Sequence, residues 1–211
     1  MKALITGANR GIGRALLDRL PKAIGTARQA SDGYKQLDVS DQDSIDALAK
    51  ELNGQPIDLL VCNAGVFRDK GRKAGDEFPT ELWQQTFATN VFGVFQTVQA
   101  FLPNLRLGTK PKIAIISSGL GSQKLANGGE YIYRASKAAA TNIARNLAAD
   151  LKSEGIAVAA YHPGWVPTDM GGTNATVSMD DSADGLIKCF NKLDIATTGS
   201  FLRFDGVELP F

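Results

Sequence analysis

Cysteine, histidine and excess charge are all scarce in this sequence of 211 residues. Its two cysteines, Cys62 and Cys189, have no metal-type spacing and form no disulfide framework, which favours a reducing cytoplasm and predicts no metal centre. The 23 basic and 22 acidic residues leave a net charge of +1, too weak a field to recruit nucleic acid or an acidic membrane. The apolar start, Ala3–Ile5, is too short for a signal peptide or a membrane span. Collagenous, disordered, membrane-spanning and disulfide-scaffold classes are therefore excluded.

Short apolar runs alternate with amphipathic stretches along the chain, and no repeat or linker interrupts them. Strands are predicted at residues 2–6, 23–27, 57–62, 113–117 and 156–161. Helices are predicted near residues 12–20, 41–53, 80–102 and 131–153, with Ser40 as the N-cap of the second and Gly155 as the C-cap of the last. Continuously apolar strands that alternate with helices indicate a doubly wound parallel α/β sheet, covered on both faces, in one domain.

A glycine-rich turn follows the first predicted strand. It reads Thr6-Gly7-Ala8-Asn9-Arg10-Gly11-Ile12-Gly13, a GxxxGxG spacing that departs from the GxGxxG dinucleotide fingerprint. Three glycines are also compatible with a plain turn. A strand before the turn and a helix after it favour nucleotide binding, because the helix start offers unpaired N–H groups to a pyrophosphate.

Two arginines stand where the ribose of a dinucleotide would lie. Arg28 follows the second predicted strand, at a place where NAD-selective sites carry an acidic residue, and Arg10 lies inside the glycine turn. Guanidinium groups suit a 2′-phosphate, although either arginine alone would indicate only a solvated surface side chain. The nearest acid, Asp32, stands too far beyond the strand end to compete. The pair favours NADP over NAD.

Tyr133 and Lys137 lie four residues apart on the longest predicted helix and therefore share one face of it. An ammonium beside a phenol favours the phenolate, so we expect Lys137 to lower the pKa of Tyr133 from its ordinary value of about 10. A YxxxK spacing by itself is common on protein surfaces. Ser117 and Ser118 give it weight, because they end a parallel strand at the edge where such sheets bind ligands.

With these residues together, the chain resembles the short-chain dehydrogenase/reductase family over essentially its whole length. The motifs that match, in the family's order, are Thr6–Gly13, Asn63-Ala64-Gly65, Asn90, Ser118, Tyr133 with Lys137, and Pro163-Gly164-Trp165-Val166-Pro167-Thr168. The short build is most similar to the C-factor and sniffer-type carbonyl reductases. The resemblance implies a single Rossmann-type domain over residues 1–211, with about seven strands.

The resemblance also implies roles for individual residues. Tyr133 would be the general acid, Lys137 would hold the nicotinamide ribose and tune the tyrosine, and Ser118 would hydrogen-bond the substrate oxygen. Asn90 would sit at a kink in its helix and hold a water that relays protons to Lys137. The residues implied in cofactor binding are Gly7, Asn9, Arg10, Gly11, Ile12, Gly13, Arg28, Asp38, Val39, Asn63, Ala64, Gly65, Tyr133, Lys137, Pro163, Gly164, Val166 and Thr168.

Within that set, the Asn63–Gly65 turn would line the adenine ribose, and Asp38 with Val39 would bracket the adenine. Val166 and Thr168 would grip the nicotinamide carboxamide. The implied activity is NADPH-dependent reduction of small or medium aldehydes, ketones or diketones. The alternative is a cofactor-binding signalling protein of the C-factor type. An epimerase with a separate substrate domain is disfavoured, because only about forty residues follow Thr168.

Several assignments stay open at this point. Ser117, Ser118 and Ser122 compete for the substrate oxygen, and Tyr131 stands near Tyr133 but has no lysine four residues later. His162 is expected to be a hydrogen-bonded structural residue rather than a base.

The surroundings of the expected site leave further alternatives. Phe67 and Arg68 face either the substrate or solvent, and residues 171–184 resemble a mobile lid. A homodimer through residues 80–102 and 131–153 is expected, although the alanines there suit packing within the chain equally well.

Overall fold

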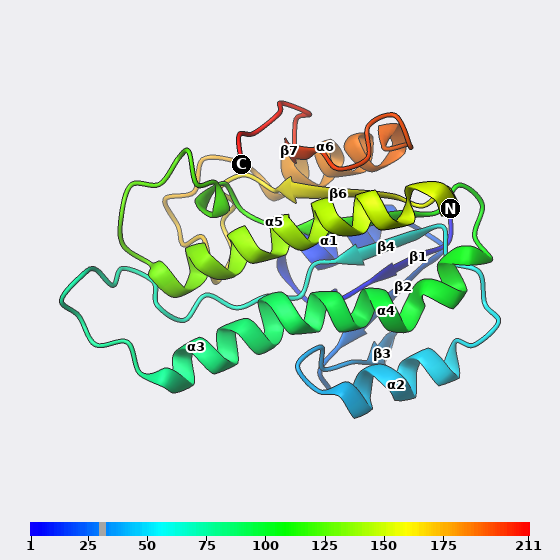
Figure 1. Ribbon diagram of the computed structural model, residues 1–211, viewed down its shortest axis with the longest axis horizontal. Helices are drawn as coiled ribbons and strands as arrows, with labels where there is room; N and C mark the ends of the chain where they lie inside the picture. Colours follow the sequence, from blue (N-terminus) through cyan, green and yellow to red (C-terminus); the bar gives the residue numbers. More distant parts are fainter. Residues whose placement is uncertain (30–32) are drawn as a thin grey trace.

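A parallel sheet of seven strands runs through the computed structural model, which describes residues 1–29 and 33–211 (Figure 1). In chain order the strands are β1 (Ala3–Ile5), β2 (Ala23–Ala27), β3 (Tyr34–Gln36), β4 (Leu59–Cys62), β5 (Lys112–Ile116), β6 (Ala157–His162) and β7 (Phe201–Arg203). They lie side by side in the order β3-β2-β1-β4-β5-β6-β7. The order reverses at β1 and β4, and such a switch point opens a crevice beyond the carboxyl ends of the strands.

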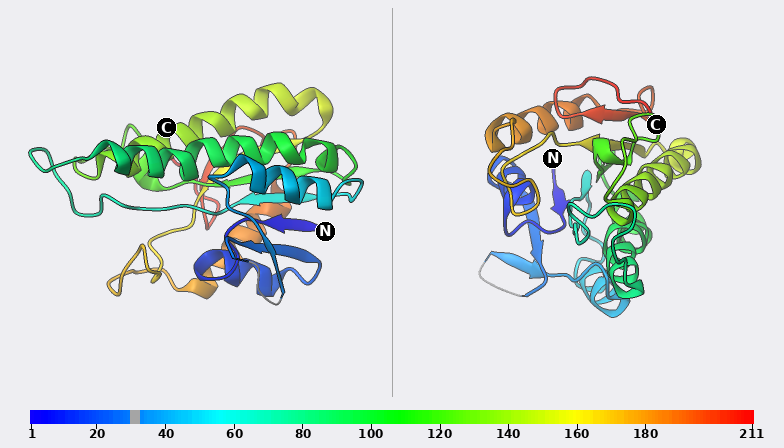
Figure 2. Two further views of the ribbon diagram at one scale, coloured as in Figure 1. Left: turned by 90° about the horizontal axis from the view of Figure 1, so that it is seen from below. Right: turned by 90° about the vertical axis from the view of Figure 1, so that its left-hand side faces the viewer.

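Helices cover both faces of this sheet (Figure 2). One face carries α1 (Gly11–Arg19) and α6 (Met179–Lys192). The other carries α2 (Gln42–Glu51), α4 (Gly93–Arg106) and α5 (Tyr131–Leu151). Each face has its own buried apolar cluster between sheet and helices. The prediction of a Rossmann-type doubly wound α/β fold is confirmed.

The two outermost strands were not among the predicted apolar runs. Residues of β3 are half-buried or exposed, and only the first residue of β7 is fully buried. An edge strand has one neighbour and water on its other side, so it shows no continuous apolar pattern. By contrast, all four residues of β4 are buried.

The long helix predicted at residues 80–102 is three segments in one line. It consists of α3 (Thr80–Phe87), a π-helical turn (Ala88–Phe92) and α4. The turn places Asn90 at its centre, where the resemblance implied a kink, and such π turns are frequent at functional sites. Gly93 follows the turn because a Cβ there would collide with the carbonyl oxygen of Val39.

The structure tests the predicted start of α2, the predicted end of α5 and the lid expected at residues 171–184. Asp41, rather than Ser40, caps α2 by accepting from Asp43 N at 3.1 Å, while the Ser40 hydroxyl turns back to Asp38. Gly155 ends the α5 region with a φ of 74°, as predicted. The expected lid at residues 171–184 is partly wrong, because α6 begins at Met179.

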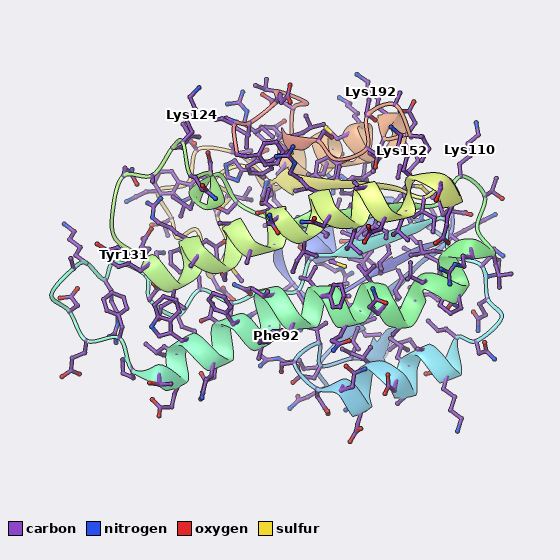
Figure 3. The ribbon with its side chains drawn as sticks, viewed as in Figure 1. Phe92, Lys110, Lys124, Tyr131, Lys152 and Lys192 are labelled. Atoms are coloured by element: carbon purple, nitrogen blue, oxygen red, sulfur yellow. The ribbon has the colours of Figure 1, made fainter. Side chains whose placement is uncertain are left out.

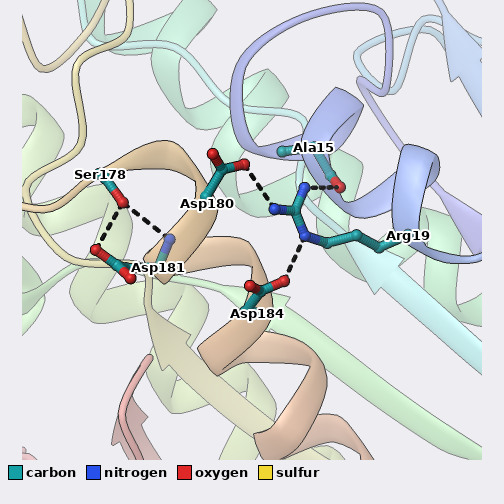
Figure 4. Close-up of polar contacts among 6 residues, drawn as sticks. All are labelled: Ala15, Arg19, Ser178, Asp180, Asp181 and Asp184. Atoms are coloured by element: carbon teal, nitrogen blue, oxygen red, sulfur yellow. Dashed lines mark hydrogen bonds and ion pairs between the residues drawn. The ribbon is translucent and has the colours of Figure 1, made fainter.

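Arg19 fastens the start of α6 to α1 (Figure 4). Its guanidinium donates to Asp180 at 2.6 Å and to Asp184 at 2.5 Å, and it also donates to Ala15 O. Ser178 caps α6 by accepting from Asp181 N at 3.0 Å. These contacts hold the chain beyond residue 178 against the first helix.

None of the helices in the described part of the chain is long and apolar enough to cross a bilayer. The described residues also contain no group of three or more metal-ligating side chains.

Candidate active site

The glycine turn after β1 is held by residues that follow β4. Asn63 Nδ2 donates to Thr6 O at 2.9 Å and to Gly7 O at 3.0 Å. The Thr6 hydroxyl accepts in return from Asn63 N and Ala64 N, both at 3.0 Å. Gly7 has a φ of 64°, which glycine adopts without strain. These four hydrogen bonds therefore hold the turn between β1 and α1 rigidly at the switch point of the sheet.

The start of α1 keeps its backbone N–H groups available. Its N-cap, Arg10, has extended backbone and provides no side-chain cap. A Cβ at Gly13 would collide with Gly7 O and with Asn63 Nδ2, so only glycine lets the helix approach the turn this closely. Ile12 is half-buried and packs against the core. A braced turn that leads into an uncapped helix is suited to an anionic ligand.

The two predicted phosphate-binding arginines lie at the same edge of the sheet, but they have different surroundings. Arg10 and Asn9 are exposed, and Arg10 Nη1 donates to Asp169 Oδ2 at 2.5 Å. Arg28 is exposed directly after β2. The interaction with Asp169 was not anticipated, because it joins residues 159 positions apart. Asp32 lies outside the described residues.

Beyond β3, Asp38 and Val39 occupy contrasting environments. The Asp38 carboxylate accepts from Ser40 N at 2.9 Å and from Ser40 Oγ at 2.6 Å. The Val39 side chain is buried in the core under α4. Only the main chain of Val39 is therefore free to bracket a planar ring, whereas the carboxylate of Asp38 is half-exposed.

Tyr133, Lys137 and Asn90 come together behind the Asn63–Gly65 turn. Lys137 Nζ lies 5.7 Å from the centroid of the Tyr133 ring and donates to Ile116 O at 2.9 Å. A Cβ added at Gly65 would stand 3.3 Å from Asn90 Oδ1 and 3.5 Å from Lys137 Nζ. Glycine at this position leaves room beside both polar groups.

The three candidate serines have separate partners. The Ser117 hydroxyl is bonded to Lys137 O at 3.0 Å and to Thr141 Oγ1 at 2.7 Å, deep in the core. Ser122 is buried and accepts from Leu125 N. The Ser118 hydroxyl accepts from Leu120 N at 3.2 Å, and it also lies close enough to the phenol of Tyr133 to lower its pKa. The geometry thus favours Ser118 over its neighbours.

Burial governs the protonation of both central groups. It raises the pKa of Tyr133 to about 12, and the Ser118 hydroxyl offsets only part of that rise. Burial also lowers the pKa of Lys137 to about 8. The pKa of Tyr133 therefore lies above its ordinary value rather than below it as expected, because desolvation of the phenol is the largest cause and Lys137 is not among the groups that shift it.

The side-chain amide of Asn90 is engaged with the protein. Its Oδ1 accepts from Val66 N at 2.8 Å, and its Nδ2 donates to Val66 O at 2.9 Å. The same Nδ2 donates to Ser136 Oγ at 3.0 Å, and that hydroxyl donates to Tyr133 O at 2.7 Å. Ser136 was not singled out from the sequence, where only its place inside the YxxxK spacing marks it.

The loop after β6 closes the other side of the site. Gly164 has a φ of 87°, and Pro163 O accepts from Ser182 Oγ at 2.6 Å. Val166 is buried, whereas the Thr168 hydroxyl accepts from Gly171 N at 3.1 Å. Gly11 faces this loop, because a Cβ there would lie 3.4 Å from the Thr168 methyl group. Trp165 is 49% exposed at the rim.

The surroundings of Tyr131 and His162 show what kind of position each residue occupies. Tyr131 is 42% exposed at the outer end of α5 and contacts Phe78 edge-on (Figure 3). His162 is not the satisfied residue that we expected, since its buried Nδ1 has no partner among the described residues. Burial lowers the pKa of His162 to about 4, so the imidazole is neutral.

Comparison with known proteins identifies the family. The family model for short chain dehydrogenases matches residues 17–177. The chain belongs to the short-chain dehydrogenase family. It is 36% identical over 166 residues to the C-signal of Myxococcus xanthus, a match that covers 78% of this chain and 99% of that protein.

Solved structures of carbonyl reductases share the whole fold. The NADPH-bound carbonyl reductase from chicken fatty liver has a TM-score of 0.89 and 29% identity, covering 100% of this chain and 98% of its own. The carbonyl reductase Sniffer of D. melanogaster has a TM-score of 0.92 and 27% identity, covering 100% and 99%. The prediction of a short-chain dehydrogenase/reductase similar to this group is confirmed.

Proposed function

We propose that the protein is an NADPH-dependent reductase of small or medium aldehydes, ketones or diketones, with Tyr133 as the proton donor. The observation that carries the proposal is that Ser118 and Lys137 both lie close to Tyr133, with Lys137 beside Gly65, at the sheet edge that also holds the braced glycine turn. Binding of a dinucleotide alone requires no buried acid at that edge. A poised acid beside a nucleotide-binding turn is the arrangement of a carbonyl reductase.

The residues that are present fit a dinucleotide. Gly7, Gly11 and Gly13 leave room for a pyrophosphate at the uncapped start of α1. Arg10 and Arg28, both exposed at the ribose edge, suit a 2′-phosphate and favour NADP over NAD. The chicken carbonyl reductase that shares the fold has NADPH bound, which supports the same cofactor here.

Bound NADPH supplies the hydride that reduces the carbonyl carbon. The chain supplies the proton and the position. The Tyr133 phenol donates its proton to the carbonyl oxygen, and a pKa of about 12 keeps that phenol protonated at neutral pH. Ser118 donates a hydrogen bond to the same oxygen as negative charge develops there.

Lys137 then compensates the charge that Tyr133 is left with. With a pKa of about 8, it is still mostly protonated at pH 7 and can stabilise a phenolate. The contact from Asn90 through Ser136 to Tyr133 O holds the first turn of α5 in register with the loop after β4. Asn90 Oδ1 also faces Gly65 beside Lys137, the position from which it would hold a relay water.

NADPH oxidation, followed optically against a panel of aldehydes, ketones and 1,2-diketones, tests the proposal. We expect turnover that Tyr133→Phe reduces by about 10²- to 10⁴-fold with NADPH affinity unchanged, because only the transferable proton is lost. Tyr131→Phe is the matched control, two residues away and exposed. Retained turnover in Tyr133→Phe would refute the assignment.

The likeness to the M. xanthus C-signal supports a second candidate, a cofactor-binding signalling protein. In that case NADPH would bind tightly while the whole panel stays silent. Catalytic substitutions would then leave the biological effect unchanged, whereas substitutions in the glycine turn would abolish it.

A homodimer through α4 and α5 is the assembly that the exposed aromatics support. Phe92, just before α4 (Figure 3), is 64% exposed, and Phe95, in the first turn of α4, is 40% exposed. Apolar side chains left in water are typical of association surfaces. Light scattering of the purified protein and of Phe92→Glu measures the mass, which we expect to fall from two chains to one.

A further inference from the structure

Helix α5 begins without a capping side chain of its own. The residue before it, Glu130, has a left-handed φ of 51° and makes no side-chain cap bond. The sequence places none of the usual capping residues Ser, Thr, Asp or Asn there. Yet this helix start carries Tyr133, so its unpaired N–H groups need a partner from elsewhere.

Asp69, from the loop after β4, provides that partner. Its carboxylate accepts from Ile132 N at 2.8 Å and from Tyr133 N at 3.2 Å, across 63 and 64 positions of sequence. The residue is 0% exposed. A buried carboxylate is costly unless it is fully hydrogen-bonded, and here both oxygens meet the positive end of a helix. The arrangement caps α5 from a distance.

The loop after β4 also contacts the side chain of Tyr133. Phe67, two residues before Asp69, stacks on the Tyr133 ring with 4.0 Å between centroids and 15° between planes. Further bonds tie the loop to its surroundings: Glu130 N donates to Arg72 O at 2.8 Å, and Lys70 Nζ donates to Met170 O at 2.8 Å. Asp69 thus fixes both the backbone of Tyr133 and the ring that covers it.

We propose that Asp69 is a positioning residue, which sets the place of the Tyr133 phenol by capping α5 and by holding Phe67 on the phenol ring. The catalytic part of this inference rests on the proposed function. Displacement of a reacting group by about 1 Å can lower a rate by about 10²-fold, so release of this cap changes turnover more than it changes stability.

The test compares Asp69→Asn and Asp69→Ala with the same changes at Asp41. Asp41 is a matched control, because its carboxylate caps α2 by accepting from Asp43 N. We expect kcat to fall about tenfold in Asp69→Asn, which keeps one acceptor oxygen, and about a hundredfold in Asp69→Ala. The NADPH dissociation constant stays unchanged. The Asp41 variants lose thermal stability without losing kcat.

A spectroscopic measurement tests whether Asp69 positions the Tyr133 ring, and it does not depend on enzyme activity. The Tyr133 ring signal in protein labelled with ¹³C-tyrosine, assigned by its loss in Tyr133→Phe, carries the ring-current shift of the stacked Phe67. Asp69→Ala should move it towards the unstacked position, and Asp41→Ala should not. A folded Asp69→Ala whose Tyr133 signal stays in place would overturn the proposal, as would unchanged kcat in an active enzyme. An absence of turnover in the wild-type protein would contradict the proposed function instead. The ring signal would still show whether Asp69 positions Tyr133.

Discussion

The ring of Phe67 lies parallel to the ring of Tyr133, with 4.0 Å between their centroids. Phe67 follows β4, and Tyr133 stands in the first turn of α5, so the loop after β4 and the start of α5 meet in this one contact. The stacked ring removes water from one face of the phenol. It is therefore part of the burial that raises the pKa of Tyr133 to about 12.

Phe67→Ala should lower the pKa of Tyr133 towards its ordinary value of about 10, because the exposed face regains water to solvate the phenolate. Titration of the ¹³C-tyrosine signal checks this. The wild-type phenol should stay protonated at pH 10.5, where the variant titrates. Phe78→Ala is the control, since Phe78 contacts the exposed Tyr131 instead. An unchanged midpoint in Phe67→Ala would mean that other groups cause the burial.

Lys137 should give the reductase an alkaline limb near pH 8. Its pKa is lowered to about 8 by burial, so the ammonium is present below that pH and lost above it. Stabilisation of the Tyr133 phenolate is lost with it, and kcat/KM, which reports the groups of the unliganded enzyme, should fall as the pH rises through 8. A pH profile of kcat/KM measures the midpoint. Lys137→Met should have low kcat/KM at every pH and no such limb, and a limb that persists in the variant would contradict the assignment.

Arg10 and Arg28 should discriminate between the two nicotinamide cofactors. Replacing both by glutamine should raise the NADPH dissociation constant about tenfold or more, since each charge-assisted bond to a phosphate contributes about 1.5–3 kcal/mol. NADH lacks the 2′-phosphate, so its affinity should change little. Fluorescence titration with both cofactors gives the two constants. Equal weakening of both would show that the arginines do not read the 2′-phosphate.

Asp169 should compete with that phosphate for Arg10. The exposed pair that they form contributes about 0.2–1 kcal/mol, as surface ion pairs do. Asp169→Asn frees the guanidinium, so NADPH should bind about 1.5- to 5-fold more tightly at low salt, with NADH unaffected. Raised salt should shrink the difference. In the Arg10→Gln background Asp169→Asn should have no effect, and tightening there would point to another partner.

Much of the fold and the main residues of the candidate site could be predicted from the sequence, because these features are local or periodic. The apolar runs predict the buried strands, and the four-residue spacing predicts that Tyr133 and Lys137 share a face of α5. The edge strands β3 and β7 could not be predicted this way, since water on one side removes their apolar pattern.

The electrostatics of the site depended on the tertiary structure. Ser117 and Ser118 are neighbours in sequence, and only folding directs one hydroxyl to Thr141 and leaves the other beside Tyr133. Likewise, the direction of the pKa shift of Tyr133 reflects how completely the phenol is desolvated, which no spacing encodes.

The sequence by itself determined the class of the protein: a parallel α/β sheet, a glycine turn open to a phosphate, and a phenol with an ammonium one helical turn away. Only the tertiary structure decided how that phenol is held. Asp69 and Phe67 reach it from a loop more than sixty positions away. Contacts of that kind form because burial of a charge or a ring demands a partner, and the partner is chosen by proximity in the folded chain rather than along the sequence.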